Sequence, residues 1–229
     1  EAAWRRLQAC RNVAAVRPMT HFANADMPGD THTPSQLARF ARLRLPGECS
    51  LANSAGVLSW PESHADWVRP GIMLYGVSPL LDRTGADEGL RPVMTLSTRL
   101  IAVKEVRAHE TVGYAATWTA AADGRIGIAA MGYGDGYPRH APSGTPVLVR
   151  GRTVPVVGRV SMDMLAVDLA ALPDAAIGDA VVLWGHGLAV EGVAGLAGTI
   201  AYELLCGVTG RVHAQVVDRA AETTQDTTR

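Results

Sequence analysis

Three scarcities in the sequence narrow the classes of protein that it can encode. No Cys-x-x-Cys pair and no even-numbered set arises from Cys10, Cys49 and Cys206, which disfavours a disulfide framework and favours a reducing, cytoplasmic location. No apolar run reaches the ~18 residues that span a bilayer, so no membrane partner is expected. The 21 basic residues include one lysine, Lys104, and are spread along a chain of formal net charge −1, so no nucleic-acid partner is expected.

Two motifs that would indicate metal or dinucleotide chemistry are also missing. The segment HFANADMPGDTH offers His21, Asp26 and His32, but their spacing matches no zinc-ligand pattern, and no metal is expected. The glycine-rich segment GYGDGYP opens no helix, so it is not a dinucleotide-binding fingerprint. We interpret both segments as loops.

The sequence does contain enough apolar residues for a substantial core. Its 229 residues are 48% hydrophobic and 19% charged, which fits one large or two ordinary globular domains. Strands and helices alternate with short connections in the first part of the chain, and this order predicts a parallel sheet. The expected elements are an amphipathic helix within 1–13, a strand over 15–23, a helix over 33–45, a strand over 49–53, a helical turn over 54–60 and a strand over 71–76.

The helix over 33–45 has the clearest boundary signals. Thr33 suits the N-cap, Pro34 suits the first helical position, and Gln36 would complete a capping box. Pro46 and Gly47 end the helix.

The pattern changes near residue 92, where closely spaced alternating strands begin and predict an antiparallel β domain or small barrel. The expected strands cover 95–106, 125–131, 145–151, 152–160, 164–170, 179–184 and 211–218. One helix is expected over 193–206, with Gly207 as its C-cap. The predicted domains are therefore 1–92 and 93–218, followed by a disordered polar tail over 219–229.

Chemically useful residues fall at the ends of the strands expected in the first domain. They are His21, Ser54 and the Arg69–Ile72 stretch, where Gly71 lets a backbone amide approach a ligand. In a barrel of parallel strands, the carboxyl ends form the active-site face. An imidazole, a hydroxyl, a guanidinium and two backbone amides suit a phosphorylated, flat, heteroaromatic ligand. The ring would stack on His21, and Arg69 would meet either the phosphate or a ring nitrogen.

Several longer segments carry a family resemblance. They run from Met19 to Val212 and read MTHFANAD, CSLANSAG, DWVRPGIMLYG, VGYAATW, GYGDGYPRHAPSGTPVLV, VGRVSMDMLAVDL and AYELLCGVTGRV. Together they closely resemble bacterial alanine racemases, which use pyridoxal phosphate (PLP) to interconvert L- and D-alanine. The resemblance implies an α/β plus β fold, namely the C-terminal part of a PLP-binding (β/α)8 barrel followed by an antiparallel β-barrel-like domain.

The resemblance also implies roles for individual residues. Tyr114 would be a catalytic base, and Met162 and Asp163 would line the substrate site. The entrance would be narrowed by Asp26, Tyr133, Arg139 and Arg159, together with Tyr202. The cofactor would be held by His21 against the ring, by Arg69 at the pyridine nitrogen, and by Ser54, Tyr202 and the backbone of Gly71 and Ile72 at the phosphate. Family members place Tyr114, Tyr133, Arg139 and Met162 at the partner subunit's site, so a homodimer is implied.

The chemistry of racemisation accounts for these residue types. The α-proton leaves one face of the amino acid and returns on the other, so two bases are needed. Tyr114 would be one of them, and a phenol of ordinary pKa about 10 needs nearby positive charge to act at neutral pH. An arginine at the pyridine nitrogen makes the ring a weaker electron sink, which restricts side reactions.

One required residue has no counterpart in this chain. Family members carry a Schiff-base lysine, which also serves as the second base, whereas Lys104 lies in an alternating strand and reads as solvated. We therefore expect the chain to be a C-terminal portion of an alanine racemase and to be inactive alone. The alternatives are a non-catalytic fragment that acts in dimerisation or binding, and an amino-acid racemase of broader specificity. A basic amino-acid decarboxylase is disfavoured because the three cysteines do not match.

Overall fold

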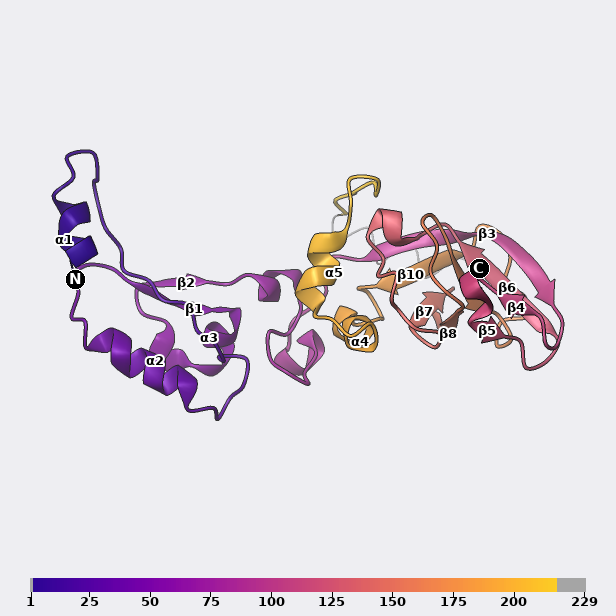
Figure 1. Cartoon of the computed structure of the whole chain (residues 1–229), viewed down its shortest axis with the longest axis horizontal. Coiled ribbons are helices and arrows are strands. Elements are labelled where there is room, and N and C mark those ends of the chain that lie inside the picture. The colour runs from indigo at the N-terminus through magenta and orange to yellow at the C-terminus, as the bar shows by residue number, and fades with distance from the viewer. Residues whose placement is uncertain (1, 218–229) are drawn as a thin grey trace.

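The computed structural model describes residues 2–217, which form two lobes joined by a short connection (Figure 1). The N-terminal lobe contains α1 (Ala2–Gln8), α2 (His32–Ala41), β1 (Ser50–Asn53), α3 (Ser54–Ser59), η1 (Pro61–Ser63), β2 (Trp67–Arg69) and η2 (Ile72–Tyr75). The two strands pair in parallel, with Asn53 opposite Arg69. This pairing places the ends of β1 and β2 side by side, which positions the candidate site.

Three local expectations for this lobe are wrong. The strand predicted over 15–23 is reduced to a single parallel bridge between Met19 and Ser50. The segment predicted as a strand over 71–76 forms the 3-10 helix η2, which ends at Gly76 with a left-handed φ of 78°. A short apolar run cannot be assigned to strand or helix by periodicity alone, and here the turn geometry decides.

The predicted capping box of α2 is also wrong. The helix begins at His32, and its N-cap, Thr31, makes no side-chain cap hydrogen bond. Gln36 instead ties the helix to the preceding segment, because its side chain accepts the Ala23 amide and donates to the His21 carbonyl. The side chain is thus used for a tertiary contact rather than for the helix start.

The C-terminal lobe is built around a closed barrel, as the alternating strands predicted. The barrel order is β10-β3-β6-β9-β8-β7, with every neighbouring pair antiparallel. A small hairpin of β4 (Thr111–Val112) and β5 (Trp118–Thr119) stands beside it. The barrel strands are β3 (Leu96–Val106), β6 (Gly124–Ala129), β7 (Pro146–Val149), β8 (Arg152–Val157), β9 (Leu165–Asp168) and β10 (Ala180–Trp184).

The barrel interior is apolar and tightly filled. Trp184, at the end of β10, is fully buried and stacks on Tyr137 with ring centroids 5.9 Å apart. Ile72 of η2 and Val77 belong to the same buried cluster as the barrel residues. The core of the C-terminal lobe therefore extends into the connection between the lobes.

The helix predicted over 193–206 is two helices, α4 (Val190–Leu196) and α5 (Ala201–Gly207), bent by 102°. Gly198 lies between them with a left-handed φ of 69°, which ends α4. Gly207 is the last residue of α5, and Val208 is its C-cap. Within residues 2–217, no single helix is long and apolar enough to cross a membrane. The bent α4–α5 pair taken together would be long and apolar enough, by length and composition only.

The chain after α5 differs from the expected strand over 211–218. Residues 211–217 form no strand, and residue 218 lies outside the described residues. The predicted disordered tail over 219–229 also lies outside them. Two short 3-10 helices complete the elements used below, η3 (Gly85–Glu88) between the lobes and η5 (Tyr133–Asp135) after β6.

Candidate functional site

Ser54 receives two backbone amides from a different segment of the chain. Its side chain is buried at the start of α3, where Asn53 caps the helix by accepting the Gly56 amide. The Ser54 hydroxyl accepts the amide of Gly71 at 2.8 Å and that of Met73 at 3.4 Å. Backbone amides that converge on one oxygen form a concavity suited to an anion.

Met73 is a residue that the sequence analysis missed. The Ser54 hydroxyl accepts the amide of Met73, which the sequence analysis did not name. The Ile72 side chain is buried in the barrel core, and the expected contact of the Ile72 amide with a phosphate stays a prediction. The sequence did not indicate the Met73 amide because residues 71–76 were predicted to form a strand, whereas residues 72–75 form a 3-10 helix. The first amides of a helical turn lack partners within the turn, so they point outward together.

Arg69 is fixed at the end of β2 by the neighbouring strand ends. Its Nη1 donates to the Ser50 hydroxyl at 2.6 Å, and its Nη2 donates to the carbonyls of Thr20 at 2.7 Å and Leu51 at 3.4 Å. Its Nε makes no hydrogen bond with residues 2–217 in the structure. The guanidinium is therefore oriented, with its Nε–H and the second N–H of Nη1 left to donate to a ligand.

His21 lies beside the end of β1. Its Nε2 is 3.5 Å from Nδ2 of Asn53, the residue that precedes Ser54 and lies opposite Arg69. The structure thus gathers His21, Ser54, Arg69 and Gly71 at one end of the parallel strand pair. We refer to these residues, together with Met73, as the strand-end cluster.

Tyr202 and Asp26 connect this region to the C-terminal lobe. Tyr202 lies on α5 and is about half exposed, and Leu204 of α5 belongs to the same buried cluster as Ile72 of η2. Partial burial raises the pKa of the Tyr202 phenol, and the Asp26 carboxylate raises it further. The Asp26 carbonyl accepts the amide of Leu81. Two residues far apart in the sequence are therefore close enough for their charges to interact.

A second group of predicted residues surrounds a hollow of about 390 Å³ on the C-terminal lobe. The hollow is lined by Gly113, Tyr114 and residues 161–164, which include Met162 and Asp163. Tyr114 is 69% exposed and Met162 is 52% exposed, so both are open to a ligand. We refer to this group as the rim cluster.

The turn that presents Tyr114 has an unusual backbone. Gly113 has a φ of 81°, and the two residues after Tyr114, Ala115 and Ala116, have φ of 61° and 49°. Non-glycine residues in this region are strained, and such strain gathers at functional sites. A Cβ at Gly113 would lie 3.0 Å from the amide nitrogen of Arg159, so this turn packs closely against the exposed Arg159.

Tyr133 and Arg211 support the other side of the rim cluster. The Tyr133 amide donates to the Ser161 carbonyl at 3.0 Å. Arg211, which the sequence analysis did not single out, places Nη2 2.5 Å from Asp163 and Nε 3.3 Å from Asp135. Arg139 is exposed, and neither of the two groups described above includes it. Among residues 2–217, no three His, Cys, Asp or Glu side chains gather into a metal-binding group.

The two clusters lie on different lobes. The strand-end cluster follows β1 and β2, whereas Tyr114 lies between β4 and β5 at the opposite end of the molecule (Figure 1). One copy of these residues therefore does not bring Tyr114 to Ser54.

The fold and the site define a two-lobed protein in which polar groups gather at the carboxyl ends of parallel strands, as in barrel enzymes. The sequence pattern of "Alanine racemase, N-terminal domain" matches residues 1–79, and that of "Alanine racemase, C-terminal domain" matches residues 93–216. The chain belongs to the alanine racemase family.

Named relatives are similar over nearly the whole chain. Alanine racemase of Shewanella amazonensis is 59% identical over 91% of this chain and 58% of its own length. The biosynthetic alanine racemase of Escherichia coli is 55% identical over 95% of this chain and 62% of its own length. The chain thus spans about three fifths of the length of these relatives.

Solved structures agree with the fold. The biosynthetic alanine racemase of Pseudomonas aeruginosa superposes with a TM-score of 0.88 at 52% identity, covering 92% of this chain and 60% of that one. The alanine racemase of Bartonella henselae, solved with covalently bound pyridoxal phosphate, superposes with a TM-score of 0.79 at 29% identity. The match covers 92% of this chain and 60% of that one. The predicted fold class is confirmed.

Proposed function

We propose that this chain forms part of a PLP-dependent alanine racemase, a cytoplasmic homodimer that interconverts L- and D-alanine. The observation that carries the proposal is the convergence of the Gly71 and Met73 amides on the Ser54 hydroxyl, beside the oriented Arg69, in a chain of this family. By full-length protein we mean these residues joined to the remaining part that the relatives have.

The strand-end cluster fits the two ends of PLP. The Ser54 hydroxyl suits the phosphate, and the Gly71 and Met73 amides, which donate to Ser54 in this structure, would turn to the phosphate together with the Ile72 amide. A Cβ built on Gly71 would meet only the Ser54 hydroxyl within 4 Å, at 3.9 Å. The free Nε of Arg69 suits the pyridine nitrogen, and the His21 ring suits the face of the cofactor. When bound, PLP makes the α-proton of an amino acid acidic by drawing electrons into its ring.

The chain's own groups then divide the remaining tasks. The Arg69 guanidinium keeps its protons, so it donates a hydrogen bond to the ring nitrogen without protonating it. Tyr114 takes the α-proton from one face of the amino acid or returns it there. Met162 and Asp163 line the substrate side of the same hollow.

The separation of the two clusters supports a homodimer. A two-fold symmetric pair would bring the rim cluster of one subunit to the strand-end cluster of the other. Tyr133 and Arg139 would act with Tyr114 and Met162 at the partner subunit's site, and Asp26 and Arg159 would narrow the entrance.

We expect the 229 residues alone to form no D-alanine. Their only lysine, Lys104, lies on β3 opposite Ile126 of β6 and is exposed, remote from the strand-end cluster. The measurement is chiral chromatography of L-alanine incubated with the purified chain and PLP. Robust D-alanine formation would contradict this expectation. PLP binding without turnover by the full-length protein would support the alternative of a non-catalytic role.

Replacing Ser54 with alanine in the full-length protein tests the phosphate site. Loss of a hydrogen bond to a charged group should raise the Kd for PLP by about 10- to 100-fold. The Kd is measured by absorbance titration of the apoprotein. Ser59→Ala, which removes a hydroxyl from the same helix, is the matched control and should bind as the wild type does. Equal Kd values for both variants would place the phosphate elsewhere.

The substrate is tested on the same full-length protein with a panel of L-amino acids. Turnover restricted to alanine supports the proposal. Comparable turnover of serine or larger amino acids would favour a racemase of broader specificity.

A further inference from the structure

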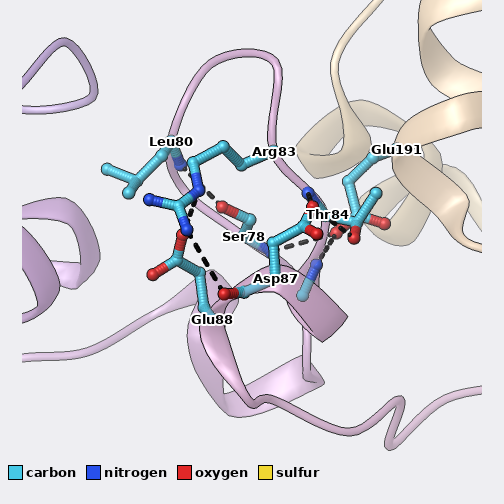
Figure 2. A network of polar contacts seen from close by, with 8 residues as sticks. Ser78, Leu80, Arg83, Thr84, Asp87, Glu88 and Glu191 are labelled. Atoms are coloured by element: carbon cyan, nitrogen blue, oxygen red, sulfur yellow. Dashed lines mark hydrogen bonds and ion pairs between the residues drawn. The ribbon is translucent and has the colours of Figure 1, made fainter.

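Glu191 ties the connection between the lobes to α4 of the C-terminal lobe through a single carboxylate oxygen. It lies in the first turn of α4 and is partly buried. Its Oε1 accepts the amides of Ser78 at 3.0 Å and Gly85 at 2.8 Å, as Figure 2 shows. Both amides belong to residues 77–91, which we call the junction loop. A carboxylate that accepts two amides forms charge-assisted hydrogen bonds, which are stronger than neutral ones.

The junction loop is braced by its own side chains. The Asp87 carboxylate accepts both the amide and the hydroxyl of Thr84 at 2.8 Å, and Arg83 is ion-paired with Glu88 at 2.7 Å. These contacts brace residues 83–88, and the two hydrogen bonds to Glu191 tie the loop to α4 (Figure 2).

The loop continues directly from the strand-end cluster. Gly71 and Met73 supply the amides on Ser54, and only Gly76 separates η2 from the loop. A displacement of the loop is therefore transmitted along the backbone to these amides.

The loop also contacts the surroundings of Tyr202. Leu81 donates its amide to the carbonyl of Asp26, whose carboxylate acts on the Tyr202 phenol. Tyr202 lies on α5, which follows α4 in the chain. Glu191 therefore completes a closed series of connections. It links α4 to the junction loop, the loop is linked to Asp26 by the Leu81 amide, and Asp26 lies near Tyr202 on α5, which follows α4 in the chain.

We propose that Glu191 is a positioning residue that holds Tyr202 and the Gly71–Met73 amides at the separation needed to reach one phosphate group. The inference rests on the proposed function. Within residues 2–217, the side-chain hydrogen bonds of Glu191 go to the Ser78 and Gly85 amides, so it acts through the junction loop and Tyr202 rather than on the reaction.

The first test is the Kd for PLP of full-length Glu191 variants. Glu191→Ala removes both hydrogen bonds and should raise the Kd about 10-fold, whereas Glu191→Gln keeps an acceptor oxygen and should stay within about 3-fold. Glu105→Ala is the control and should match the wild type, since this carboxylate on β3 is exposed and makes no side-chain hydrogen bond or ion pair within residues 2–217.

The second test separates positioning from general stability. In a Tyr202→Phe background, Glu191→Ala should change the Kd by no more than about 2-fold, because coupled residues are non-additive. Hydrogen exchange in the apoprotein should be faster at the Ser78 and Gly85 amides in Glu191→Ala. If that variant does not fold, Glu191→Asp, one methylene shorter, should show the same changes in weaker form.

The outcomes distinguish the inference from the proposed function. If the wild type binds PLP and the Glu191 variants match it, or if their effect is fully retained with Tyr202→Phe, the positioning role is overturned alone. If the wild-type full-length protein binds no PLP, the proposed function falls and the inference with it.

Discussion

Replacing Tyr114 with phenylalanine in the full-length protein is expected to lower kcat for alanine racemisation by about 10³-fold. The change removes one of two bases and leaves the exposed ring in place, so the fold and PLP binding should be retained. The measurement is the initial rate of D-alanine formation, with PLP content read from the absorbance spectrum.

Tyr75→Phe is the matched control for this prediction. Tyr75 is 48% exposed on η2, so it also loses a solvent-accessible phenol hydroxyl. Its kcat should stay within about 2-fold of the wild type, as is usual for surface changes. A Tyr114→Phe variant as active as Tyr75→Phe would remove Tyr114 from the mechanism.

Gly76→Ala should be the most damaging single change at the junction between the lobes. Gly76 has a φ of 78°, and a Cβ there would lie 1.7 Å from the Arg91 carbonyl oxygen. The left-handed backbone costs ~1–2 kcal/mol for a non-glycine residue, and the clash adds ~1–3 kcal/mol. The free energy of unfolding should fall by about 2–5 kcal/mol, measured by urea denaturation, and PLP affinity should fall because η2 is displaced.

Gly89→Ala separates backbone strain from the clash. Gly89 has a similar φ of 69°, but a Cβ there would meet nothing within 4 Å. Only the strain of ~1–2 kcal/mol should appear, with PLP affinity unchanged. If the free energy of unfolding fell equally in the two variants, the close contact between residue 76 and the Arg91 carbonyl would add nothing to the loss of stability.

The barrel could be predicted from the sequence because its strands are short, apolar and closely spaced, and the longest of them, β3, alternates over its first half. Leu96, Leu100 and Val106 of β3 are buried while their neighbours are exposed, and this period of two survives any error in strand ends. The first lobe was harder, because its short apolar segments have no decisive period. Residues 72–75 bury Ile72 in a 3-10 turn, and the turn is imposed by Gly71 and Gly76.

Residues of the candidate site could be predicted from the sequence only where the side chain itself would bind the cofactor or take part in the reaction. Ser54, Arg69 and Tyr114 stand in family motifs, and the structure places them at strand ends or on a rim. Met73 contributes a backbone amide, which any residue type has, so the sequence gives no sign of it. Glu191 acts through contacts between segments more than 100 positions apart, which no local pattern reveals.

The measurement that tests the central claim most directly is racemisation by the full-length protein in deuterated water. With PLP bound, L-alanine should convert to D-alanine that carries deuterium at Cα, and the same exchange should occur from D-alanine. A folded, PLP-loaded protein that forms no D-alanine and exchanges no α-proton would contradict the assignment.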